Sequence, residues 1–180
     1  MNFKFNVNIT EQDYLDFNVF AGTKTPQGKK TVLRSRLIIA GVVLFALLLI
    51  WITDKGGTVS LVTTPLFLLM LLYFQLYHVR KMKNSMKAYI QNLKKHGKLP
   101  YSPCSTVEFN DESIIETDEN SATERKYSVI EAIAVDKTSV YVFIGVAQAF
   151  ILPFSSFESR EQMDAFIEFI SAKCPNIVRY

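Results

Sequence analysis

Two long apolar runs without a charged side chain constrain the fold of this chain more than any other feature. Residues 37–53 read LIIAGVVLFALLLIWIT and residues 58–79 read TVSLVTTPLFLLMLLYFQLYHV. As α-helices these runs would be roughly 25 Å and 33 Å long, so each could cross the hydrocarbon core of a bilayer. Only residues 54–57 separate them, and these include two consecutive glycines. We therefore predict an antiparallel transmembrane hairpin over residues 37–79.

A soluble domain with two buried core helices is the alternative interpretation of these runs. Such helices would need other elements to cover their apolar surface on all sides. The rest of the chain is short and contains every charged residue except Asp54 and Lys55. It is too small and too polar to supply that cover, so the sequence favours the membrane.

Basic residues on both sides of the hairpin predict that the two termini lie in the cytoplasm. Five Lys or Arg residues lie between positions 24 and 36, and the second run is followed by Arg80, Lys81, Lys83 and Lys87. Such residues accumulate on the cytoplasmic side of membrane helices. The last four are also candidates for binding lipid headgroups, because each basic side chain near an anionic surface contributes on the order of 1 kcal/mol. Flanking charge without a headgroup contact is the alternative.

Polar side chains inside the second run suggest contacts between the two helices. We expect Thr63, Thr64 and Gln75 to form hydrogen bonds across the hairpin, and Pro65 to bend its helix. An oligomer of hairpins with these residues facing inward would be a channel or a transport accessory. An oligomeric channel or transport-accessory subunit is therefore the alternative function.

The C-terminal part differs from the rest in charge and in pattern. Residues 1–104 carry 14 Lys or Arg and 4 Asp or Glu, whereas residues 105–180 carry 6 and 13. The acidic part contains β-prone runs at residues 106–109, 113–117, 126–135, 139–144 and 149–152, separated by turn residues. Ser159 and Gln162 have the spacing of a capping box before an amphipathic stripe. We predict a small α+β domain, in which an antiparallel sheet is followed by a C-terminal helix.

The N-terminus also has the pattern of a strand. Residues 3–9 alternate between apolar and polar side chains, and because a lone strand is unstable we expect it to pack on the C-terminal domain. Thr10 and Asp13 predict the start of a short helix that carries Tyr14, Phe17 and Phe20. Residues 22–30, with a proline and a glycine, predict a loop before the membrane.

The sequence offers no motif for catalysis, a metal or a cofactor. His78 and His96 are the only histidines, and the only cysteines are Cys104 and Cys174, which we expect to be free thiols. His96 and Cys104 could be drawn as a base and a nucleophile, but they lie in a linker rich in Gly and Pro. We expect no enzymatic activity, no cofactor and no nucleic-acid partner.

The chain resembles the YcxB-like family of bacterial membrane proteins. The resemblance rests on the opening FKFNVNITEQDYLDF, the lysine-flanked hairpin, and the later segments VEFNDESIIETDEN, KYSVIEAIAVDKTSVYVFIGVAQAFILPFSSF and EQMDAFIEFI. It implies a bacterial inner membrane and a C-terminal domain with a pleckstrin-homology-like fold. It implies no mechanism. Phosphoinositide binding does not follow from it, since Asn110, Asp111 and Glu112 occupy the turn where such domains generally carry basic residues.

These observations predict four regions and one function. Residues 1–36 form the cytoplasmic strand and helix, residues 37–79 the hairpin, residues 80–104 a basic helix and linker, and residues 105–180 the acidic domain. With no chemistry visible on the domain, we expect a membrane-anchored interaction or sensing module. Its partners would be the lipid bilayer, an unidentified protein and further copies of the same chain.

Overall fold

The chain forms two compact units that differ in composition and architecture. The computed structural model describes residues 2–174 and 178–179. Residues Gly22–Ser85 form one unit, here called the hairpin unit, and Met1–Ala21 with Met86–Tyr180 form the other, the sheet unit. Two long apolar helices, a small antiparallel sheet domain and a C-terminal helix confirm the predicted fold class.

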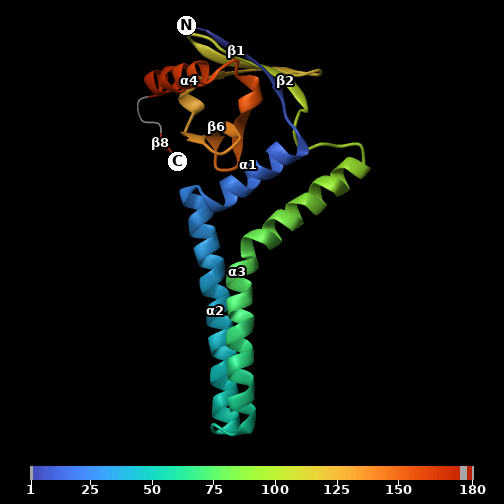
Figure 1. Cartoon of the computed structure of the whole chain (residues 1–180), viewed down its shortest axis with the longest axis vertical. Coiled ribbons are helices and arrows are strands. Elements are labelled where there is room, and N and C mark those ends of the chain that lie inside the picture. The colour runs from blue at the N-terminus through green and yellow to red at the C-terminus, as the bar shows by residue number, and fades with distance from the viewer. Residues whose placement is uncertain (1, 175–177, 180) are drawn as a thin grey trace. The chain divides into compact units, whose positions relative to one another are not determined.

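The hairpin unit consists of helix α2 (Pro26–Asp54) and helix α3 (Thr58–Lys95) as far as Ser85. The two helices run antiparallel and lie side by side from the connecting turn onward, until α3 diverges from α2 (Figure 1). The last turns of α3 continue into the sheet unit. Between the helices, Lys55 and Gly56 have φ angles of 50° and 76°, in the left-handed region that glycine adopts without steric cost. The carboxylate of Asp54 accepts hydrogen bonds from the backbone N–H and the hydroxyl of Ser60, at 2.7 and 2.8 Å. The tight turn is therefore fixed by its own side chains.

Helix α2 begins earlier than the sequence indicated. The loop expected over residues 22–30 is wrong, because helix α1 (Glu11–Thr23) ends at Thr23 and α2 begins at Pro26. A proline in the first turn loses no helical hydrogen bond, and its fixed φ suits a helix. The hydroxyl of Thr25 accepts a hydrogen bond from the N–H of Gly28 at 3.1 Å. Pro26 therefore starts a helix with Thr25 as its cap.

Most apolar side chains of α2 and α3 face away from protein. Leu44, Leu66 and Leu76 are 58%, 65% and 70% exposed, whereas only a few residues such as Val43 and Leu47 are buried between the helices. A core helix of a soluble protein would have most of these side chains covered. Both helices are long and apolar enough to cross a membrane.

The sheet unit contains two four-stranded sheets. The first has the order β1-β2-β3-β4, and the second has the order β7-β6-β5-β8. The strands of the first sheet are β1 (Phe3–Asn8), β2 (Cys104–Phe109), β3 (Ser113–Thr117) and β4 (Ala122–Lys126), and those of the second are β5 (Ala132–Val135), β6 (Ser139–Gly145), β7 (Gln148–Pro153) and β8 (Val178–Arg179). All neighbouring strands are antiparallel except the two-residue β8, which is parallel to β5.

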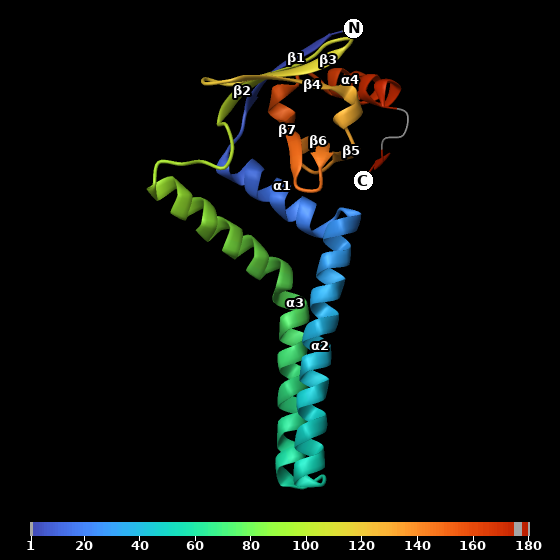
Figure 2. The ribbon, with the colours of Figure 1, turned by 180° about the vertical axis from the view of Figure 1, so that it is seen from behind.

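Strand β1 pairs with β2 although the whole hairpin lies between them in the sequence. The pairing runs from Phe3 opposite Phe109 to Asn8 opposite Cys104. Figure 2 shows β1 lying along the first sheet. The hairpin is thus inserted between the first two strands of the sheet unit.

The single strand expected over residues 126–135 is wrong. The chain forms β4, then a 3₁₀ turn η1 (Tyr127–Val129), and then β5. The turn moves the chain from the first sheet to the second, and it places the Tyr127 side chain in the core. Strand β4 was missed because most of its residues are exposed and none is a large apolar residue.

An aromatic core joins the first sheet to helix α4 (Arg160–Lys173). The ring of Phe166, fully buried, lies 4.8 Å from that of Phe109, 5.0 Å from that of Phe5 and 5.5 Å from that of Phe3 between centroids. As expected, the Ser159 hydroxyl caps α4 by accepting a hydrogen bond from the backbone N–H of Gln162 at 3.2 Å. Strands β1 and β2 and helix α4 therefore share one hydrophobic core with residues of the second sheet.

Helix α1 covers the second sheet. Phe17 and Phe20 are buried against Tyr141 and Phe143 of β6, with ring centroids 5.2 to 6.2 Å apart. Thr10 and Asp13 exchange hydrogen bonds at the start of α1, as the sequence predicted. The helix that leads directly to α2 is thus part of the domain core.

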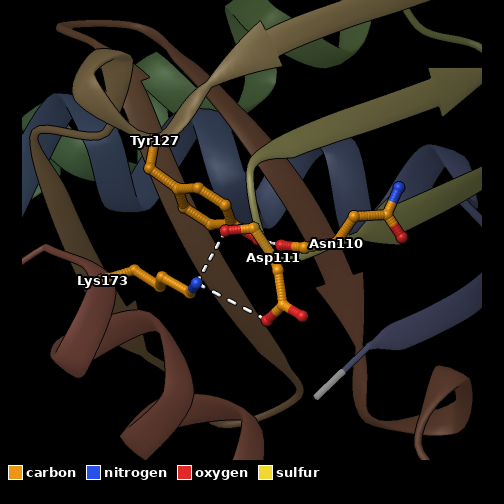
Figure 3. A network of polar contacts seen from close by, with 4 residues as sticks. All are labelled: Asn110, Asp111, Tyr127 and Lys173. Atoms are coloured by element: carbon orange, nitrogen blue, oxygen red, sulfur yellow. Dashed lines mark hydrogen bonds and ion pairs between the residues drawn. The ribbon is translucent and has the colours of Figure 1, made fainter.

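The far end of α4 is tied to the turn between β2 and β3 (Figure 3). The ammonium group of Lys173 donates a hydrogen bond to the carbonyl of Asp111 at 2.6 Å and lies 3.6 Å from its carboxylate. The Tyr127 hydroxyl donates to the carbonyl of Asn110 at 2.6 Å, and burial raises the pKa of Tyr127 to about 12. This turn is therefore held by the domain itself.

Candidate functional site

A cleft of about 390 Å³ opens in the sheet unit between its two sheets, helix α1 and the linker before β2. Phe3 and Phe5 of strand β1 contact helix α4. Ile9, which follows the last residue of β1, lines the cleft. The lining comes from Ile9, Tyr14, Phe17, residues 100–102, Glu116, Arg125, Ile144 and residues 147–151. The lining combines apolar and polar groups, and a concave site with converging polar groups is a candidate binding site.

Glu116 and Arg125 supply the charges of this cleft. Glu116 lies opposite Thr123, and Arg125 opposite Ile114, so the two charged side chains share one face of neighbouring strands β3 and β4. Burial raises the pKa of Glu116, and the positive charge of Arg125 partly opposes that rise. The buried Nε of Arg125 has no hydrogen-bond partner among residues 2–174 and 178–179. A guanidinium in this position can donate to a carboxylate, a phosphate or a backbone carbonyl of a bound molecule.

Two tyrosines form the aromatic side of the cleft. The rings of Tyr14 and Tyr101 are stacked, with centroids 4.9 Å apart. Tyr14 lies on α1, which leads to α2, and Tyr101 lies in the linker that follows α3. Burial raises the pKa of Tyr101, with smaller contributions from Glu11 and Asp13. A molecule bound here would touch both segments that connect the sheet unit to the long helices.

The three polar residues predicted to form hydrogen bonds between the long helices, Thr63, Thr64 and Gln75, have different hydrogen-bond partners. The indole N–H of Trp51 donates a hydrogen bond to the Thr64 hydroxyl at 3.0 Å, which links α2 to α3. Thr63 donates to the carbonyl of Val59 in its own helix at 2.8 Å. Gln75 contributes its backbone carbonyl, which accepts from a guanidinium nitrogen of Arg36 at 3.2 Å.

The four candidate headgroup residues all lie on helix α3, and their role stays a prediction. Arg80 and Lys81 line a groove of the hairpin unit, and Lys83 is half-buried outside that lining. Lys87 belongs to the sheet unit. Cys104 and Cys174 are free, the former exposed and the latter buried. Within the described residues, no three His, Cys, Asp or Glu side chains gather as a metal site would require.

The charged pair of the cleft was missed in the sequence. Arg125 lies in β4, which has no alternating apolar pattern, and Glu116 looks like an ordinary surface residue of an acidic domain. Only the register between β3 and β4 puts them on one face. Tyr14 was noted as a helix residue, but nothing in the sequence indicated that it would stack on Tyr101.

Comparisons with known proteins identify one part of the chain. No curated protein and no solved structure matches it. A family model does match residues 109–170, which run from the end of β2 to α4, and its description is YcxB-like protein. The chain therefore carries a YcxB-like domain, and the resemblance inferred from its sequence is confirmed over these residues.

Proposed function

We propose that this protein is a membrane-anchored, non-enzymatic module whose cytoplasmic sheet unit binds a protein partner through the cleft. The sheet unit would have a pleckstrin-homology-like fold, and the chain would cross a bacterial inner membrane twice with both termini in the cytoplasm. The observation that carries this proposal is the lining of the cleft. Tyr14 comes from the segment before the hairpin and Tyr101 from the segment after it.

Pairing between β1 and β2 supports the proposed topology. These strands lie on either side of the hairpin in the sequence and share one sheet. Because they pair, the two ends of the hairpin must lie on the same side of a membrane. Lys and Arg flank those ends, while the connecting turn contains only Lys55, so that side is expected to be the cytoplasm.

The position of the cleft also supports a sensing role. Only Lys24 and Thr25 separate α1 from α2, and α1 is held on the second sheet by Phe17 and Phe20. A partner that displaced Tyr14 from Tyr101 would act on both connections to the anchor at once. Binding would thereby be coupled to the position of the helices.

Site-specific crosslinking in intact bacterial cells tests the proposal. A photoreactive amino acid at Tyr101 should give a discrete adduct with another protein, and Arg125→Ala in the same chain should abolish that adduct. The matched control is the same amino acid at Lys137, an exposed turn position outside the cleft. An identical adduct from Lys137, or an adduct insensitive to Arg125→Ala, would refute binding through the cleft.

The channel hypothesis stays a prediction from the sequence. The hydroxyl groups of Thr63 and Thr64 form hydrogen bonds within a single hairpin. A two-helix pore needs several copies of the chain, so the mass of the protein in detergent tests it. A monomer or dimer would contradict it.

A further inference from the structure

The hairpin unit has a groove between its two helices at the end away from the connecting turn. Its volume is about 790 Å³. Helix α2 contributes Ser35 and Ile39, and α3 contributes most of the remaining lining, including Tyr73, Tyr77, Arg80 and Lys81. From Tyr73 to Lys81 the groove rises roughly 12 Å along α3. It therefore passes from the apolar part of the helix to the basic part.

The chemistry of the groove changes along that length. At the apolar end the rings of Tyr73 and Tyr77 are stacked, with centroids 4.4 Å apart, and both side chains are exposed. At the basic end the ammonium group of Lys81 lies 5.8 Å from the centroid of the Phe74 ring. Tyrosine is typical of the membrane interface, where an apolar ring and a polar hydroxyl are both accommodated.

One buried polar atom in this groove has no hydrogen-bond partner among the described residues. The Nδ1 atom of His78, which lines the groove, is buried and makes no hydrogen bond with the described residues. The only acidic residue between positions 22 and 85 is Asp54, which lies at the opposite end of the unit beside the connecting turn. Nothing acidic in this unit therefore neutralises Arg80 and Lys81.

We propose that this groove holds the headgroup and glycerol region of one anionic phospholipid. The phosphate would lie at Arg80 and Lys81, the tyrosine hydroxyls would donate to the ester region, and the acyl chains would follow the apolar surface of α3. The proposal goes beyond partner binding by the cleft and shares with the proposed function only the insertion of the hairpin into a membrane. A phospholipid fits better than a protein segment, because the groove changes from apolar to basic in the same direction in which a phospholipid changes from acyl chains to an anionic headgroup.

Lipid retention by the purified full chain tests this site. The protein in mixed micelles would be titrated with phosphatidylglycerol or phosphatidylcholine, and the bound copies counted by native mass spectrometry. We expect one tightly held phosphatidylglycerol. Since each basic residue near an anionic lipid contributes on the order of 1 kcal/mol, Arg80→Gln with Lys81→Gln should weaken binding roughly thirtyfold.

The control removes the same charge elsewhere. Lys29→Gln with Lys30→Gln lies in the same unit and outside the groove lining, and it should change phosphatidylglycerol binding less than threefold. Equal losses in both double variants would overturn the site in favour of diffuse charge. Equal binding of the two lipids would also overturn it. So would a changed oligomeric state of the groove variant with unchanged lipid retention, because a second copy would then be the occupant.

Membrane insertion is measured separately. Extraction of cell membranes with alkaline carbonate should leave the wild-type chain and both double variants in the membrane. Release of the wild type would refute the anchor and the lipid site together. Retention of all three with no preference for phosphatidylglycerol would refute the lipid site alone.

Discussion

Replacing Phe5 by alanine tests whether strand β1 is part of the folded sheet unit. The Phe5 side chain is 1% exposed, and its ring lies within 6.1 Å, between centroids, of those of Phe3, Phe109, Phe157 and Phe166. Truncating a buried phenylalanine costs about 3–5 kcal/mol, because apolar contact is lost and a cavity remains. Small domains have a total stability of about 5–15 kcal/mol. A loss of about 4 kcal/mol would raise the unfolded fraction roughly a thousandfold.

Pulse proteolysis of the full chain in detergent, over a urea series, measures this change. Brief digestion reports the fraction of sheet units that are open at each urea concentration. We expect the midpoint for Phe5→Ala to fall strongly, and removal of residues 1–10 to make the sheet unit sensitive to protease without urea. The hairpin unit should be unaffected, which a label on its helices would verify.

Lys4→Ala is the matched control in the same strand. Lys4 points to the exposed face, where its ammonium group lies 2.7 Å from the Glu108 carboxylate. A surface ion pair contributes about 0–1 kcal/mol, so this change should shift the midpoint only slightly. If Phe5→Ala shifts it no more than Lys4→Ala does, β1 is not packed in the core and the proposed topology loses its support.

Three further substitutions test local features. Burial raises the pKa of Glu116 above its ordinary value of 4.5, so near that pH the folded state binds more protons than the unfolded state. The free energy of unfolding should therefore fall as the pH rises from 4.5 through the raised pKa. Glu116→Gln should weaken this pH dependence in urea titrations, and an unchanged slope would contradict the burial. The buried Tyr141 hydroxyl interacts with the Ser139 hydroxyl, but the pair lacks hydrogen-bond geometry, so Tyr141→Phe should change the stability of the sheet unit by no more than about 1 kcal/mol, and a larger loss would show that the pair stabilises the fold. A double-mutant cycle of Trp51→Phe and Thr64→Val in bilayers should give a coupling of about 0.6 kcal/mol, whereas additive effects would show that their hydrogen bond does not stabilise the hairpin.

The sequence predicted the elements well where one physical signal dominated. The uncharged runs matched α2 and α3, and the paired glycines matched their turn. The alternation of residues 3–9 and the Ser159 cap matched β1 and α4. In each case the signal depends on neighbours in the sequence, and no distant contact was needed to interpret it.

The errors arose where distant contacts decide the structure. Whether residues 126–135 form one strand or two depends on the core position that receives Tyr127. Pro26 was taken as a loop residue because its role depends on whether a helix follows at once. The cleft was not predictable, because strand register and the docking of α1 bring Glu116, Arg125 and the two tyrosines together.

The insertion of the hairpin between β1 and β2 has a consequence for biosynthesis. The 95 residues between Asn8 and Cys104 take roughly 5–20 s to translate, so the first strand leaves the ribosome long before its partner exists. Until then its three apolar side chains, Phe3, Phe5 and Val7, have no sheet to cover them. A chain with only one helix inserted would leave β1 and β2 on opposite sides of the membrane. On the proposed topology, completion of the sheet would select the molecules in which both helices have been inserted.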